Sequence, residues 1–381
     1  MIYLDNAATS FPKPARVSDE MLRCMRQYCG NPGRGSHALA MEAAERIYAC
    51  REEAAAFFGV SSPENVIFTP NTTVALNMAV KGLLRQGDHV LLSDMEHNAV
   101  YRPVQKLKNQ GRITFDVFPS LVTHPEATVA DLCMGIAKCL RPNTRMLICT
   151  HASNICSWKA PLRELGAFCR RHGLLFVVDA AQSAGHEVID MKEMAIDALC
   201  VPGHKGLLGP QGSGMLLLGD GIMADTLLEG GSGYNSLDAE MPLEAPERYE
   251  AGTLATPAIV GLCEGIREVK RLGVASIARH IAGLNARLQN HLRHLPGVRI
   301  YAPQHSGAVL LFGVEGISAD GVGDWLNRCG FCVRAGYHCS ALGHTTLNTP
   351  PGGAVRVSPG IYNTKEQMDH FASAVEELLK K

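Results

Sequence analysis

The stretch LLFVVDAAQSAG, residues 174–185, decides the fold because it indicates a buried strand that ends at a carboxylate. Its aliphatic run stands directly before Asp179, and Gln182 follows three residues later. Interior strands of parallel sheets have this near-continuous apolar composition. In open α/β sheets ligands bind just beyond the carboxyl ends of the strands, so the two polar side chains are candidates for a ligand site. Asp179 could equally cap the start of a following helix.

Around this strand, from about residue 40 to residue 220, helical patterns alternate with short apolar strands. Residues 40–60 have a helical period, and the short apolar runs that follow include NVIFT (65–69), HVLLS (89–93) and RMLICT (145–150). Such a succession predicts βα units, which form a mostly parallel sheet covered by helices.

The C-terminal third has a different pattern. Residues 229–257 are rich in glycine and proline and too long for a simple connection, which indicates a functional loop or an interface, or else a plain linker. A helical pattern then runs from Ile259 to about Leu295, followed by short strands and a terminal helix over 364–381. We predict a smaller α+β domain here, with residues 340–353 in a loop.

The composition is that of a globular protein, because 46% of the 381 residues are hydrophobic and 19% are charged. A net charge of −1 argues against binding to nucleic acid or to an acidic membrane surface. We see neither a run of roughly 20 apolar residues that could cross a bilayer nor a signal peptide. The 13 cysteines are scattered, so we expect free thiols in the reducing cytoplasm. Cys329 and Cys332 form a C-x-x-C pair, for which packing is a better explanation than a zinc or redox site, and we expect no metal.

A lysine in DALCVPGHKGLLGPQGSGMLLL, residues 197–218, is the next candidate. Lys205 stands between an apolar strand and a glycine-rich turn, where a charged amine is costly unless it is paired or covalently engaged. A Schiff base with an aldehyde cofactor removes that cost. Together with Asp179, which can keep a pyridine nitrogen protonated, it forms the pair that a pyridoxal phosphate (PLP) enzyme needs. A surface lysine in a loop is the alternative.

Two further segments could complete a cofactor site. In residues 65–84 a strand leads through Asn71, Thr72 and Thr73 into a helix, whose free N–H groups and hydroxyls favour a dianion, although capping alone also explains them. His97 follows the strand HVLLS and could lay its ring against a flat cofactor, although a lone histidine is more often structural.

The stretch VRAGYHCSALGH, residues 333–344, carries a candidate nucleophile. Arg334 and His338 stand near Cys339, and positive neighbours raise the thiolate fraction of a thiol. Arg356, in the strand-like AVRVS, has a planar fork that suits a carboxylate. The alternative for Cys339 is an inert buried thiol, which we expect for most of the other cysteines.

Short motifs then occur in the order seen in one enzyme family: YLDNAAT, EHNAV, HASNICSW, VDAAQSAG, GHKGLLGPQGSG, EAGTLATP, RAGYHC and RVSPGIYNT. On these motifs the chain resembles the class V, fold-type I PLP-dependent enzymes, and most of all their cysteine desulfurase and selenocysteine lyase branch. The resemblance covers nearly the whole chain. It implies a large domain, residues 15–258, around a mostly parallel seven-stranded sheet. It also implies a small α+β domain, residues 259–381 together with 1–14.

The resemblance implies roles for residues around the cofactor ring. Lys205 would form the Schiff base, and Asp179 would pair with the pyridine nitrogen. Gln182 would bond the ring oxygen. Asn154 would lie near that oxygen and the substrate, and His97 would stack on the ring and take part in catalysis.

The phosphate would be bound by Thr72, Thr73 and His204, with Thr256 reaching across from a second subunit of a homodimer. One departure from the family is Pro202, where relatives usually have a serine or threonine that donates to the phosphate. Proline has neither a hydroxyl nor an N–H. We therefore predict weaker PLP retention than in typical relatives, unless Thr73 or a water compensates.

By the same resemblance Arg356, with Arg334, would bind the substrate carboxylate, and Cys339 would accept the sulfur. The implied activity is conversion of L-cysteine to L-alanine, with a persulfide passed to an acceptor protein. Iron–sulfur cluster assembly, thiolated RNA and cofactors are open destinations for the sulfur. A selenocysteine lyase is the nearest alternative. Another class V activity, such as an aminotransferase or C–S lyase, and a non-enzymatic binding protein also remain open.

Overall fold

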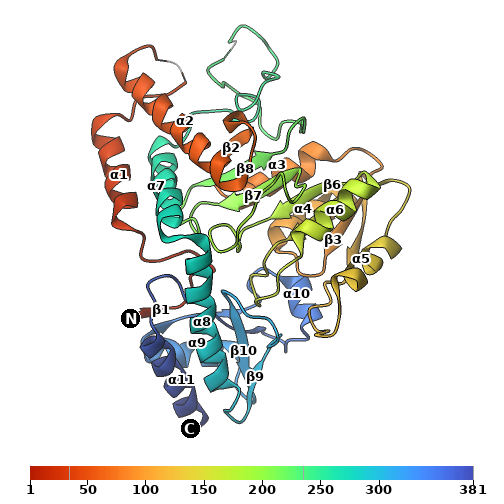
Figure 1. Cartoon of the computed structure of the whole chain (residues 1–381), viewed down its shortest axis with the longest axis vertical. Helices are drawn as coiled ribbons and strands as arrows, with labels where there is room; N and C mark the ends of the chain where they lie inside the picture. The colour runs from red at the N-terminus through yellow and green to blue at the C-terminus, as the bar shows by residue number, and fades with distance from the viewer. Residues whose placement is uncertain (34, 235, 381) are drawn as a thin grey trace.

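The computed structural model describes residues 1–33, 35–234 and 236–380. Figure 1 shows a larger α/β part and a smaller part below it, with both chain ends in the smaller part. The predicted fold-type I architecture is confirmed, because a seven-stranded sheet forms the centre of the larger part.

The seven strands have the order β2-β8-β7-β6-β5-β3-β4. The neighbours from β7 to β4 pair in parallel, whereas β8 is antiparallel to both β2 and β7. The carboxyl ends of β5, β6 and β7 therefore meet at one edge. The strands are β2 (Val66–Thr69), β3 (His89–Ser93), β4 (Thr114–Phe118), β5 (Thr144–Thr150), β6 (Leu175–Asp179), β7 (Ala198–Pro202) and β8 (Gly214–Leu218).

Helices cover both faces of this sheet, as its apolar strands require. Along β6, Val177 packs under α3 (Thr72–Leu83) and α4 (Asn98–Asn109). Its neighbours Phe176 and Val178 face the opposite core, because successive strand side chains alternate between faces. That second core is covered by α2 (Ala38–Phe58), α5 (Val129–Lys138), α6 (Leu162–His172) and α7 (Thr256–Leu272), while α1 (Ala15–Gln27) packs beside α7 and η1 (Pro63–Asn65) precedes β2.

The smaller part is built on an antiparallel sheet of order β12-β13-β10-β9. Helices α8, α9 and α11 pack with it around a separate apolar core. Strand β1 (Ile2–Tyr3) pairs with β11 (Phe331–Cys332), so the N-terminal segment lies with this part. The remaining elements are α8 (Val274–Leu292), β9 (Val298–Ile300), β10 (Leu310–Val314), α9 (Ala319–Arg328), β12 (Arg334–Gly336), α10 (Ala341–Thr346), β13 (Ala354–Val357) and α11 (Lys365–Leu379).

Two helical details differ from the sequence expectation. The helical pattern from Ile259 to Leu295 is divided into α7 and α8 at Gly273, whose φ of 81° ends the first helix. The predicted loop 340–353 contains the short helix α10, which leads to Leu347 in the core of the larger part. Helix α7 packs on α1 and α2, whereas α8 packs on α11, so the packing partners change at Gly273. The domain boundary between residues 258 and 259 stays a prediction.

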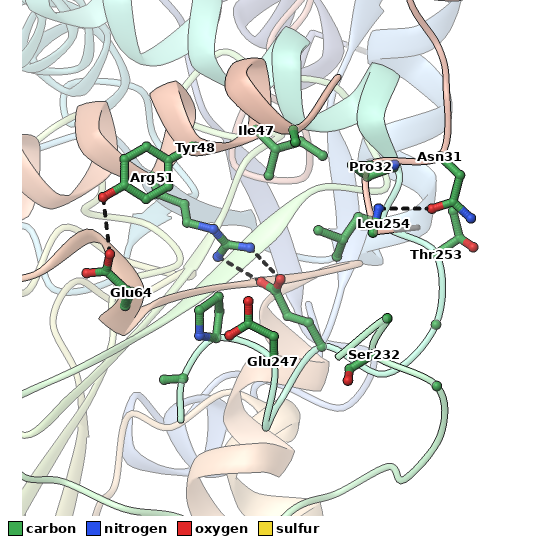
Figure 2. A pocket seen from close by; sticks show the side chains of 18 residues that line it. Asn31, Pro32, Ile47, Tyr48, Arg51, Glu64, Ser232, Glu247, Thr253 and Leu254 are labelled. Carbon is green, nitrogen blue, oxygen red and sulfur yellow. Dashed lines mark hydrogen bonds and ion pairs between the residues drawn. The ribbon is translucent and has the colours of Figure 1, made fainter. Parts of the chain in front are cut away.

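The described residues of the 219–255 segment connect β8 to α7 without a helix or strand, and a buried ion pair anchors the segment near its end. Arg51 of α2 donates from Nη1 to Glu250 Oε1 at 2.9 Å, and the Phe68 N–H donates to the same oxygen at 2.6 Å. Both residues line a cavity of about 490 Å³ between α2 and the segment, and Figure 2 shows Arg51 in its wall. In the described ranges no helix is long and apolar enough to span a membrane.

Candidate active site

A cavity lies at the carboxyl ends of β5, β6 and β7, next to the first turns of α3 and α4. It brings together the residues predicted for the cofactor, with the exception of Thr256. Its lining includes Thr72, Thr73, His97, Asn154, Asp179, Gln182, Pro202, His204 and Lys205.

Asp179 ends β6 and is 1% exposed. The N–H of Ala181 donates to its Oδ1 at 2.9 Å, but turns follow this strand, so the side chain does not cap a helix. Burial raises the pKa of Asp179 to about 6, against the opposing effects of that N–H and of Lys205. The carboxylate therefore remains mostly ionised at neutral pH and can hold a protonated ring nitrogen.

Lys205 lies in the turn between β7 and β8 and lines the same cavity as Asp179. Burial lowers the pKa of Lys205 to about 8, with Arg356 and Arg334 acting in the same direction and Asp179 against it. A larger fraction of this amine is therefore neutral at pH 7 than in an exposed lysine, which suits attack on an aldehyde.

Other residues of the cavity lining fit a phosphate. Thr72 Oγ1 and His204 Nδ1 are buried and have no hydrogen-bond partner within the described part of the chain. Asn71 caps α3 by accepting from the Val74 N–H at 3.1 Å, and the start of a helix favours an anion. Buried polar atoms without partners are rare, so these two atoms fit a bound group such as the expected phosphate. Pro202, in the same wall, offers no donor.

His97 is held as the N-cap of α4. Its Nδ1 accepts from the Ala99 N–H at 3.0 Å, which fixes the ring. Burial, followed by the charge of Lys205, lowers the pKa of His97 to about 4. The ring is therefore neutral at pH 7, as a stacking partner should be, and its predicted contact with the cofactor stays a prediction.

The N-terminal segment crosses this site, which sequence reasoning did not predict. Gln182 donates from Nε2 to the Ala7 carbonyl at 2.9 Å, and Lys13 donates from Nζ to the His204 carbonyl at 2.7 Å. Asp5, in the motif YLDNAAT, lies 2.7 Å from Arg356 Nη2. The segment thus contacts both the lysine loop and the strand that carries the arginine.

Arg356 is 2% exposed on β13, at the predicted substrate end. Its Nη1 donates to the Asn154 carbonyl at 3.1 Å, and its buried Nε has no partner among the residues that the structure describes. Arg334, on β12, places its Nε 3.8 Å from the second oxygen of Asp5. The two predicted carboxylate-binding residues therefore share one acidic neighbour, and one N–H of the buried guanidinium remains available for a ligand.

Cys339 has an exposed thiol in the turn between β12 and α10. Two bonds hold its backbone on the cavity: Asn98 N–H donates to the Cys339 carbonyl at 2.7 Å, and Asn154 Nδ2 donates to the His338 carbonyl at 2.8 Å. Burial lowers the pKa of His338 to about 3. The expectation that this histidine provides a positive charge near the thiol is therefore wrong.

Thr256 lies outside the cavity. It is 2% exposed at the first turn of α7, enclosed by its own chain, which does not fit a hydroxyl that reaches into a second subunit. Thr253, three residues earlier, is exposed and lines the cavity of Figure 2.

All cysteines lie in the described ranges and are free thiols. Cys329 packs against the core of the smaller part, and Cys332 belongs to β11. Within those ranges no cluster of three or more histidine, cysteine or acidic side chains could hold a metal ion.

Comparison with known proteins gives a consistent picture. The aminotransferase class-V family matches residues 2–371. A probable cysteine desulfurase of Methanothermobacter thermautotrophicus is 32% identical over 99% of this chain and 94% of its own length, and a cysteine desulfurase of Escherichia coli is 30% identical over 99% and 93%. An apo cysteine desulfurase from Thermococcus onnurineus NA1 superposes with a TM-score of 0.89 at 30% identity, over 100% of this chain and 94% of that one.

Proposed function

Because the chain belongs to the class-V aminotransferase family and, within it, to the cysteine desulfurases, we propose that it is a PLP-dependent enzyme that converts L-cysteine to L-alanine and leaves the sulfur on Cys339 as a persulfide. The observation that carries the proposal is the attachment of the Cys339 loop to Asn98 and Asn154. Asn154 itself lines the cavity that contains Lys205 and Asp179.

Each charged or polar residue of the cavity would have a distinct role toward the cofactor. When bound, PLP would withdraw electrons from the α-carbon of the amino acid and so weaken the bond from its β-carbon to sulfur. Asp179 would supply the negative charge at the ring nitrogen, and Thr72 with His204 would bind the phosphate. Lys205 would attach the cofactor and, once released by the substrate amine, take the α-proton on Nζ, for which its lowered pKa suits it.

The sulfur step then needs a fixed substrate and a thiol positioned to attack it. Arg356 would hold the substrate carboxylate, with Arg334 beside it. The Cys339 thiolate would attack the substrate sulfur, so that an S–S bond forms while the bond from sulfur to the β-carbon breaks. The electron pair of that bond remains on the β-carbon, which a proton converts to the methyl group of alanine. L-cysteine and a thiol thus give L-alanine and a persulfide, without an external oxidant.

The fate of the persulfide follows from exposure. An exposed Cys339 and a short following segment support transfer to the thiol of an acceptor protein rather than release of free sulfide. The many free thiols support a reducing compartment such as the cytoplasm. Apolar side chains exposed on α1, α2 and the 229–254 segment support a homodimer; they include Leu22, Met25, Leu39, Met41 and Leu237.

The proposal is tested by incubating the PLP-loaded protein with L-cysteine, measuring alanine and sulfide, and mapping the persulfide by mass spectrometry. We expect alanine from the wild type and a persulfide on Cys339, both lost in Cys339→Ala. Cys332→Ala, a partly exposed thiol on a neighbouring strand, is the matched control and should retain both. Undiminished alanine formation by Cys339→Ala, or a keto acid as product, would contradict the proposal.

A further inference from the structure

The backbone that carries Cys339 has an unusual conformation. His338 and Cys339 are consecutive non-glycine residues with φ values of 52° and 55°, in the left-handed region that side chains with a Cβ disfavour. Such a conformation persists only where surrounding contacts hold it. The two bonds to the His338 and Cys339 carbonyls hold the main chain, so the remaining question is what holds the His338 side chain.

A chain of side chains, His338–His344–Thr349, provides that support. His338 Nδ1 lies 3.2 Å from His344 Nε2, and His344 Nδ1 lies 2.9 Å from Thr349 Oγ1. At the other end, His338 Nε2 lies 3.1 Å from the Arg334 carbonyl. The two imidazoles are stacked at an angle of 12°, and the Tyr337 ring meets His344 edge-on at 5.4 Å.

With both rings neutral, these contacts assign the protons along the chain, and the Thr349 hydroxyl lies closer to His344 Nδ1, at 2.9 Å, than to the His344 carbonyl, at 3.4 Å. A carbonyl only accepts, so His338 carries its proton on Nε2 and presents a lone pair at Nδ1. His344 must then donate from Nε2, which leaves its Nδ1 to accept from the Thr349 hydroxyl. Both rings are neutral in this arrangement. Burial lowers the pKa of His344 to about 4, and burial, together with Arg356 and then His344 and Arg334, lowers that of His338 to about 3, against the bond to the Arg334 carbonyl.

The chain connects the two elements that flank the Cys339 turn with the segment beyond α10. Arg334 belongs to β12, His344 to the short helix α10, and Thr349 to the segment beyond it, with Cys339 in the turn between β12 and α10. The Thr349 N–H also donates to the His344 carbonyl at 3.1 Å, which closes the segment back onto the helix. A displaced His344 ring would leave the His338 lone pair buried and unpaired, and burying an unpaired polar group is unfavourable.

We propose that His344, oriented by Thr349, is a positioning residue that locks the His338 ring and thereby holds Cys339 in the left-handed turn from which it attacks the substrate sulfur. This proposal rests on the function proposed above. It predicts that His344 acts on the sulfur-transfer step rather than on substrate binding, because its contacts lie in the thiol loop and not at Arg356.

The test compares His344→Phe, His344→Gln and Thr349→Val as PLP-loaded enzymes. In His344→Phe we expect kcat for alanine formation to fall about ten-fold, with KM for L-cysteine within about two-fold of wild type. Hydrogen–deuterium exchange of residues 337–346 should be faster. Glutamine can donate from about the position of Nε2, so His344→Gln should recover much of the loss. Thr349→Val should show a smaller loss, about two- to five-fold.

Thr345→Val is the control, because this exposed hydroxyl donates within α10, to the Ala341 carbonyl, and should leave kcat and exchange unchanged. Wild-type kcat and exchange in His344→Phe would overturn the proposal. If that variant does not fold, wild-type behaviour of Thr349→Val overturns it instead. A failure of the proposed function looks different, because the wild type would then form no persulfide on Cys339.

Discussion

Replacement of Pro202 by serine should make the protein bind PLP more tightly. Pro202 is buried at the end of β7, in the cavity wall that also contains Thr72 and His204. A serine hydroxyl there would add one hydrogen bond to a charged phosphate, worth about 1.5–3 kcal/mol. That free energy corresponds to a roughly 10- to 100-fold lower Kd for PLP.

The matched control is Pro202→Ala, which restores the backbone N–H and removes the ring but adds no hydroxyl. Apoprotein of each variant is titrated with PLP and followed by the visible absorbance of the bound cofactor, and loss of cofactor is timed during dialysis. We expect Pro202→Ser to bind PLP most tightly, and Pro202→Ala and the wild type to bind it with similar, weaker affinity. Equal affinity of Pro202→Ser and Pro202→Ala, or full dialysis-resistant occupancy of the wild type, would refute the reasoning that this position weakens the phosphate site.

Three further measurements address other parts of the molecule. Glu250→Gln, which breaks the buried pair with Arg51, should lower the free energy of unfolding by about 3 kcal/mol in urea, whereas Glu247→Gln should change it little; equal effects would contradict a special role for the pair. Burial, with Lys159 as a lesser cause, lowers the pKa of His151 to about 4. Below the ordinary pKa of 6.5 the unfolded chain therefore binds more protons than the folded one, and the free energy of unfolding falls as the pH is lowered. Between pH 7 and pH 5 the free energy of unfolding should fall by up to about 2 kcal/mol less for the apoprotein of His151→Leu than for that of the wild type. Parallel plots of unfolding free energy against pH for the two proteins would count against this assignment. The rate of PLP uptake by the apoprotein should rise with pH and level off above about 8, the pKa of Lys205; a rate independent of pH from 6.5 to 9 would exclude the amine as the titrating group.

The sequence predicted the cavity residues Asp179 and Lys205, but it did not predict the contacts that the N-terminal residues Asp5 and Lys13 make around the cavity. Asp179 was expected at the ligand edge because it ends a buried strand, and Lys205 was expected near it because a carboxylate and a sheltered lysine are the pair that a PLP enzyme needs. Asp5 and Lys13 were missed because their contacts join residues 351 and 191 positions apart. The only signal for Asp5 was its place in a quoted motif.

The sequence also did not predict the short helix α10 or which of two nearby threonines is buried. Helix α10 has six residues, too few to give a periodic pattern. The hydroxyls of Thr253 and Thr256 stand in one glycine-rich stretch, and only packing distinguishes the exposed residue from the enclosed one. The resemblance supplied the link between Cys339 and the cavity, which spacing alone did not predict.

The N-terminal segment has a mechanical consequence. It is hydrogen-bonded at Lys13 to the lysine loop of the larger part and ion-paired at Asp5 to the arginine strand of the smaller part, with the Ala7 contact between them. Any rotation of one part against the other must therefore lengthen or break these contacts. The Lys205 amine and the Arg356 guanidinium therefore cannot separate independently of this segment, and an opening wide enough to admit a bulky molecule would first have to break a contact of residues 5–13.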